Sequence, residues 1–82
     1  MVSSSQLRAA RALAGLDQRQ LAEKAGLSVP TIQRMEASDG VIRGNVASLM
    51  RIVAALEQSG VELIAENAAS AAGGRGVRLR AP

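Results

Sequence analysis

Residues 17–37 constrain the fold most strongly, because they combine the signals of two short helices with a tight turn between them. Apolar residues recur at helical spacing as far as Ala25, and Gly26 can adopt the positive φ that often follows a helix. Ser28 is a favoured N-cap for a second helix, whose first turn tolerates a proline. Two helices that cross steeply need a small residue where they meet, and Ala22 supplies it. The segment therefore predicts a helix-turn-helix unit, which usually places its second helix in a DNA major groove.

This segment resembles the lambda-repressor/Cro-like (XRE) helix-turn-helix family of bacterial and phage regulators. The resemblance covers about residues 4–58 and is specific because several spaced positions agree at once. Two departures from the family pattern are visible. The chain after residue 58 does not read as the usual final helix, and Val29-Pro30 puts apolar groups where polar base readers often lie. The matching residues are Arg11, Gln18, Leu21, Ala22, Gly26, Ser28, Ile32, Met35 and Glu36.

The whole chain predicts a mainly α fold, a four-helix lambda-repressor-like domain with a C-terminal β-hairpin. We expect a first helix from the serine cluster at residues 3–5 to about Ala14, and further helices at about 17–25, 29–37 and 45–59. The last of these is capped by Asn45. Its predicted buried stripe is Val46, Leu49, Met50, Val53 and Leu56, with Ile52 on the exposed side.

Beyond Gly60 the apolar residues begin to alternate, which predicts strands at residues 61–66 and 76–80 around a loop at 67–75. We therefore divide the chain into a helix-turn-helix domain at 1–59 and a dimerisation hairpin at 60–82. A lone hairpin is marginal in water, so it should pack on the fourth helix or pair with another chain. The alternative is a longer fourth helix followed by a disordered tail. The expected dimerisation residues are Ile52, Val61, Leu63, Val77 and Leu79.

Composition narrows the class of function. The chain has no Phe, Tyr, Trp, Cys or His, which argues against catalysis, cofactors and metal binding, so we expect no enzyme. An aliphatic core in 82 residues is marginal, which favours a stabilising second copy. The net charge of +3 comes from the tail, in Arg75, Arg78 and Arg80. Neither a signal peptide nor a membrane-spanning run is indicated, so we expect a cytoplasmic protein.

The predicted DNA contacts divide into base readers and backbone contacts. On the second helix of the motif, Gln33 and Arg34 can hydrogen-bond to bases, and Val29 and Pro30 can meet a thymine methyl group. Thr31 more plausibly meets a phosphate. The family resemblance implies phosphate contacts for Gln18, Arg43 and Asn45, and a structural ion pair between Arg11 and Glu36.

These observations predict a sequence-specific DNA-binding transcriptional regulator that acts as a homodimer on a palindromic site in double-stranded DNA. It would repress by occlusion or activate by contact with the polymerase. The alternative is a protein-interaction module, such as an antitoxin or antiactivator, that binds a partner through its tail. RNA binding has less support, because the chain offers no aromatic platform for stacking bases.

Overall fold

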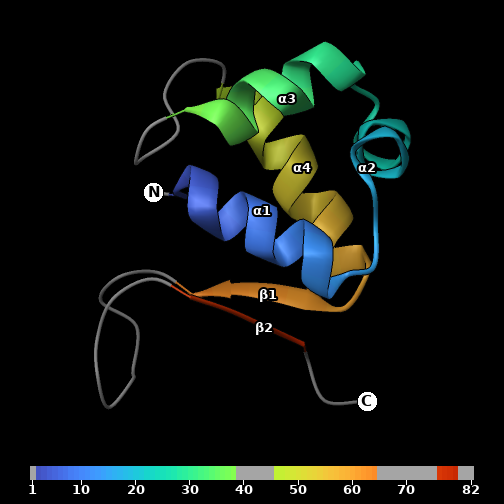
Figure 1. Cartoon of the computed structure of the whole chain (residues 1–82). Helices are drawn as coiled ribbons and strands as arrows, with labels where there is room; N and C mark the ends of the chain where they lie inside the picture. Colours follow the sequence, from blue (N-terminus) through green and yellow to red (C-terminus); the bar gives the residue numbers. More distant parts are fainter. Residues whose placement is uncertain (1, 39–45, 65–75, 80–82) are drawn as a thin grey trace.

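The computed structural model describes residues 2–38, 46–64 and 76–79, which form a mainly helical fold with one antiparallel hairpin. In Figure 1, α3 lies at one end of the molecule and the hairpin at the other, with α1 and α4 between them. The predicted fold class is confirmed. The elements are α1 (Ser4–Leu13), α2 (Gln18–Ala25), α3 (Val29–Ala37), α4 (Val46–Gln58), β1 (Val61–Ile64) and β2 (Gly76–Leu79).

Polar residues begin the first three helices. Ser3 and Asp17 each accept a hydrogen bond from the backbone N–H three residues later, and a glutamine side chain completes each capping box. Ser28 caps α3 by accepting from the N–H of Thr31. The predicted stop after α2 is confirmed, because Gly26 has a φ of 69°, in the left-handed region that favours glycine. Local signals thus define both sides of the turn between α2 and α3.

The core is aliphatic, and α4 presents a different face to it from the predicted one. Leu56 is buried as predicted, but Ile52 is buried too, whereas Val46 and Met50 are 66% and 60% exposed. Nine of the thirteen residues in α4 are apolar, so more than one face fits an apolar helical spacing. Contacts with α2 and β1 select the face that is buried. The core comprises Leu7, Ala10, Leu21, Ala22, Ala25, Ile32, Met35, Ile52, Ala55, Leu56 and Val61.

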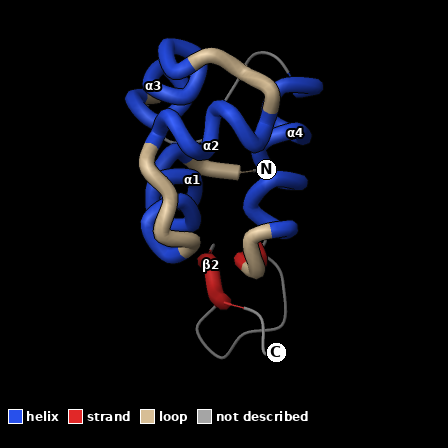
Figure 2. Tube along the Cα trace, turned by 90° about the vertical axis from the view of Figure 1, so that its right-hand side faces the viewer, coloured by secondary structure: helices blue, strands red, loops and turns tan. Residues whose placement is uncertain are grey.

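The hairpin closes one end of this core. Its strands pair with Val61 opposite Leu79 and Leu63 opposite Val77. Figure 2 shows the strands below α1 and α4, and both helices contact β1. The predicted strands are confirmed at residues 61–64 and 76–79, while 65–66, 67–75 and 80 lie outside the described residues. The alternative of a longer fourth helix is wrong, because α4 ends at Gln58.

Burial within one chain corrects the predicted dimerisation set. Ile52 and Val61 have no exposed surface, so neither can contact a second copy. Leu63 and Val77 are half-buried against the core of their own chain. Leu79 alone among the predicted set is well exposed, at 56%. The physical reason is that the hairpin covers the lower end of the short helical bundle. The inward residues of both strands pack against the core of their own chain, so they are not free to contact a second copy.

One glutamine side chain fastens the hairpin to the helices. Gln6 is 6% exposed, and its Oε1 accepts a hydrogen bond of 2.9 Å from the backbone N–H of Ser3 at the start of α1. Its Nε2 donates to the carbonyl oxygens of Ile64 at 2.9 Å and Gly76 at 3.2 Å. The same amide group therefore caps α1 and holds the end of β1 to the beginning of β2. Without the Gln6 side chain, each of these backbone groups would lose this hydrogen bond.

We expect Gln6→Ala to lower the free energy of unfolding by about 2 kcal/mol, because it removes three hydrogen bonds in a partly buried site. Urea denaturation followed by circular dichroism measures this change. Gln58→Ala, at an exposed position at the end of α4, is the control. A loss for Gln6→Ala no larger than that of the control would show that the hairpin is held by its apolar residues alone.

Candidate nucleic-acid interface

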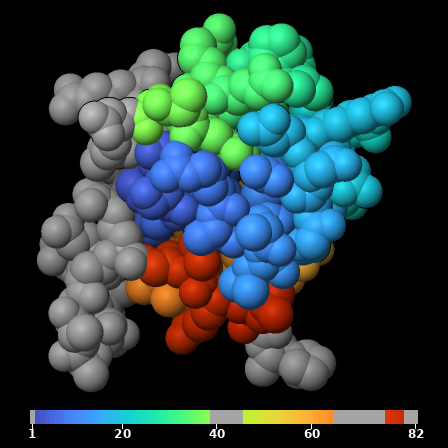
Figure 3. Space-filling view, in the orientation of Figure 1, coloured from blue at the N-terminus to red at the C-terminus, as the bar shows by residue number. Residues whose placement is uncertain are grey.

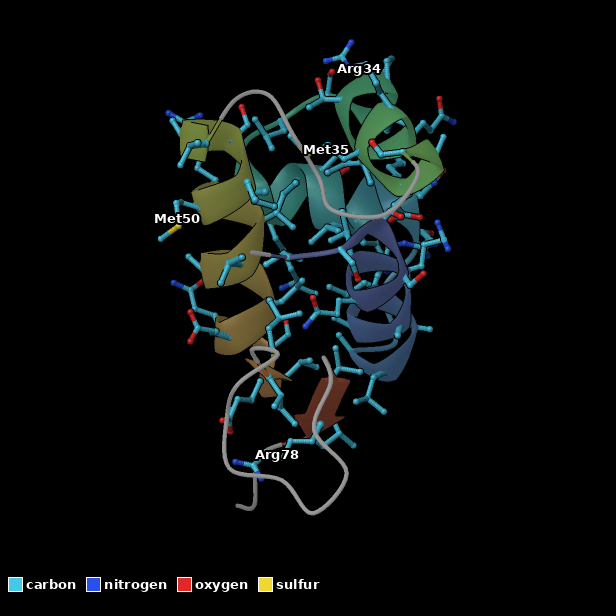
Figure 4. All side chains as sticks on the ribbon, turned by 90° about the vertical axis from the view of Figure 1, so that its left-hand side faces the viewer. Arg34, Met35, Met50 and Arg78 are labelled. Atoms are coloured by element: carbon cyan, nitrogen blue, oxygen red, sulfur yellow. The ribbon has the colours of Figure 1, made fainter. Side chains whose placement is uncertain are left out.

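Helix α3 separates cleanly into an inner and an outer face. Ile32 has no exposed surface and Met35 is 7% exposed, while Gln33 and Arg34 are exposed. Figure 4 shows Arg34 extending away from the bundle and Met35 pointing into it. The space-filling view places this helix at the upper surface of the molecule (Figure 3). The predicted base readers Gln33 and Arg34 therefore lie together on an accessible surface.

The first turn of α3 divides its residues between the core and the surface. Pro30 is exposed, but Val29 is half-buried and packs against the hydrophobic core. The hydroxyl of Thr31 lies 2.9 Å from that of Ser28, so it is already engaged in the N-cap. Pro30 thus offers an apolar surface at the beginning of α3, while Val29 and Thr31 also stabilise the helix itself.

A buried carboxylate joins the three helices of the DNA-binding unit. Glu36, on α3, is 5% exposed and receives two hydrogen bonds from the Arg11 guanidinium of α1, at 2.7 and 2.9 Å. Gln18, the first residue of α2, donates to the same carboxylate at 3.2 Å. Arg11 donates its third hydrogen bond to the carbonyl oxygen of Leu16, at 3.1 Å. The structure thus brings Arg11, Gln18 and Glu36 together and shows the ion pair that the resemblance implies.

The surroundings of Arg11 favour its charged form. The pKa of the Arg11 guanidinium is raised chiefly by its hydrogen bonds to Glu36, and burial opposes that shift. The charges of Glu36 and Asp17 raise it further. A cation with a raised folded-state pKa stabilises the fold at every pH below its unfolded value and loses that effect only as pH rises through the folded value. For arginine both pKa values are far above neutrality, so Arg11 stays charged at any pH suited to DNA binding.

Arg8 adds a contact that sequence reasoning missed. Its guanidinium donates to the backbone carbonyl of Glu36, near the end of α3, and to the Ser5 hydroxyl. A cation at a helix C-terminus also interacts favourably with the helix dipole. No local pattern marks a bond between an arginine and a distant carbonyl. The spacing of Ser3 and Gln6 is that of a capping box, but it carries no sign of the contacts between Gln6 and the hairpin.

The charges of α3 leave its outer face basic. Arg34 and Glu36 are its only charged residues, and Glu36 is neutralised by Arg11. Arg34 is exposed and accessible to an anion or to a base edge. Gln33 beside it adds an amide that can both donate and accept. Arg43 and Asn45, the other predicted DNA contacts, lie outside the described residues.

These features define a DNA-binding helix-turn-helix protein, and comparison with known proteins agrees. A family model described as helix-turn-helix matches residues 7–60. The chain belongs to the lambda-repressor-like (XRE) helix-turn-helix family of DNA-binding regulators, whose members are generally not enzymes. A comparison with curated proteins finds no significant match. In the described part of the chain, no helix has the length and apolar character needed to cross a membrane.

We expect Arg11→Ala to lower the free energy of unfolding by about 3 kcal/mol, because it leaves the buried Glu36 carboxylate without its counter-ion. Arg19→Ala is the matched control. It breaks the pair between Arg19 and Glu23, whose side chains are 82% and 69% exposed, and should cost less than about 1 kcal/mol. Chemical denaturation at low and high salt measures both changes. Equal losses in the two variants would contradict a central role for the pair.

Proposed function

We propose that this protein is a sequence-specific transcriptional regulator that places α3 in the major groove of a palindromic DNA site as a homodimer. The observation that carries this proposal is the exposed pair of Gln33 and Arg34 on a helix whose opposite face is locked into the core. Arginine can bind guanine O6 and N7 with two N–H groups, and glutamine can pair with adenine in the same way. A rigidly held helix is required, because such contacts depend on the register of the side chains along the groove.

The buried network supports this role by orienting the helix. Arg11, Gln18 and Glu36 tie α1, α2 and α3 together away from the exposed face of α3. Arg11 and Glu36 therefore position the reading helix and do not read bases themselves. The amide of Gln18 retains a second N–H for a phosphate at the N-terminus of α2, where the helix dipole favours an anion. We assign it a phosphate contact that also fixes the register of α3.

The remaining predicted contacts complete the proposed footprint. Pro30 offers a thymine methyl group an apolar surface, and Val29 can contribute only its exposed part. Thr31 meets a phosphate through a hydroxyl that already bonds to Ser28. Arg43 and Asn45 are proposed phosphate contacts on the strength of the family resemblance. A palindrome is expected because a two-fold dimer presents two identical reading helices.

We expect Arg34→Ala to weaken binding to the preferred DNA by about 1–3 kcal/mol and to relax selectivity at one base pair. The duplex is first selected from a random pool with the wild-type protein, and fluorescence anisotropy then measures affinity. Arg78→Ala is the control, because Arg78 lies at the opposite end of the molecule from Arg34 and pairs with Glu62 on the hairpin (Figure 4). Unchanged affinity and selectivity in Arg34→Ala would rule out α3 as the reader. A loss only in Arg78→Ala would indicate binding through the basic tail.

Arg43→Ala should weaken binding to every duplex alike, because a phosphate contact carries no sequence information. The slope of log K against log salt should fall in magnitude by about 1, as one fewer counter-ion is released. Titrations of the selected duplex and of a scrambled duplex at several salt concentrations measure both effects. If the loss is confined to the selected duplex, Arg43 belongs with the base readers.

A further inference from the structure

The outer face of α4 is apolar over residues 46–54, where it has no role in the core of its own chain, and it ends in the exposed Glu57 and Gln58. We define this outer face as the exposed residues Val46, Ala47, Met50 and Ala54 together with the half-buried Val53. Among the described residues, the large hydrophobic side chains that are well exposed are Leu13, Val46, Met50 and Leu79. Two of these four lie one turn apart on this face. Figure 4 shows Met50 extending from α4 into the solvent, away from the bundle.

The pattern of this face is typical of helices that pair. Val46, Met50 and Val53 follow a spacing of four and then three residues, which is the spacing of a coiled-coil seam. Arg51, one of the two charged residues in α4, lies to the side of this seam, because its guanidinium approaches Gly26 at the turn between α2 and α3. The other, Glu57, is exposed and continues the spacing four residues after Val53, so the apolar part of the seam ends at Val53. The small residues Ala47 and Ala54 allow a second helix to approach closely. A helix with exposed apolar residues opposite its buried face is expected to contact a further surface there.

The position of α3 identifies what covers this face. Two α3 helices can enter one side of a DNA duplex only if the two-fold axis runs along the direction from the hairpin to α3. The second copy must then lie beside the bundle and not below the hairpin (Figure 1). In Figure 4, α1 and α3 lie on one side of the bundle and α4 lies on the other.

The required separation of the two reading helices distinguishes these two sides. A copy packed against α1 would bring the two α3 helices close together. A copy packed against α4 leaves at least three interhelical distances of about 8–10 Å between them, which approaches the ~34 Å between half-sites. The side occupied by α4 therefore suits a dimer that reads a palindrome.

We propose that the outer face of α4 is the surface on which a second copy of this chain binds, with Met50 at the two-fold axis facing its own counterpart. This inference rests on the proposed reading of a palindrome, and it replaces the hairpin as the dimer interface. The contact joins the two copies through the helix that also supports the hairpin and the turn before α3. The dimer then holds its two α3 helices at a fixed distance from each other.

The first test introduces a charge into this face. Met50→Glu places like charges opposite each other in the dimer, and should weaken self-association by at least about 100-fold. Leu79→Glu is the matched control, because Leu79 is 56% exposed against 60% for Met50 but lies on the hairpin. Sedimentation equilibrium should give twice the 8.4 kDa chain mass for the wild type and for Leu79→Glu, and a monomer for Met50→Glu. Circular dichroism verifies that each variant is folded.

A second test uses the absence of cysteine from the chain. Met50→Cys should form a disulfide between two copies on mild oxidation, because the two-fold axis brings the two thiols together, whereas Leu79→Cys should not. The cross-linked Met50→Cys dimer should retain binding to the selected duplex. Preferential cross-linking through Leu79, a dimeric Met50→Glu variant or a monomeric wild type would each overturn the proposal. Association only with a different protein, and not with itself, would also overturn it.

Binding to a duplex with one half-site separates this inference from the proposed function. Met50→Glu should bind one half-site as the wild-type monomer does, and lose only the gain from the second half-site. If the wild type is a dimer through α4 yet binds no selected duplex, the DNA-reading proposal fails and the interface stands. If DNA binding is intact and Leu79→Glu is the variant that becomes monomeric, the α4 interface fails and the DNA-reading proposal stands.

Discussion

The Glu36 carboxylate is the interaction on which the arrangement of the DNA-binding unit depends. It comes from the end of α3, and it is bound by Arg11 of α1 and Gln18 of α2. A buried charge is unfavourable unless its hydrogen bonds are satisfied, so the three helices are strongly constrained to the one arrangement that satisfies this group. Apolar packing alone would tolerate small sliding movements of α3, whereas a bidentate bond between arginine and carboxylate does not.

A second polar contact, made by Gln6, fixes the arrangement of the hairpin and α1 at the other end of the molecule. Without aromatic residues, the core is built from small and medium aliphatic side chains, and four short helices leave its lower end open. The hairpin closes it with Val61, Leu63 and Val77. Gln6 then bonds to both strands and to the N-terminus of α1, so that the strands are held in register with the helices. Polar networks of this kind specify geometry more than they add stability.

The two exposed faces of the bundle have different chemistry, and this difference suits a regulator with two kinds of contact. The outer face of α3 carries Gln33 and Arg34, which can hydrogen-bond to a polyanion. The outer face of α4 carries Val46 and Met50, which suit a dry protein contact. α2 packs against both helices and thus connects the elements that carry the two surfaces.

Local sequence determined the helical elements and the turn of the motif. Capping by Ser3, Asp17 and Ser28 and the positive φ of Gly26 are short-range effects, so the helices around them could be predicted within a few residues. The alternation after Gly60 likewise predicted two strands. The exposure of Gln33 and Arg34 followed from the helical positions of Ile32 and Met35, which face the core.

Tertiary structure alone decided how those elements share their apolar surface. The spacing in α4 fitted a stripe through Val46 and Met50, but the contacts with α2 and β1 buried Ile52 instead. Val61 was expected at an interface between copies and fills the core of its own chain. Arg8 and Gln6 bind backbone carbonyls far away in the sequence. A helix with nine apolar residues in thirteen has more than one apolar face, so its sequence does not identify the buried one. Every residue has a backbone carbonyl, so no residue type marks the carbonyl that a side chain will bind. Only the folded chain could specify these contacts.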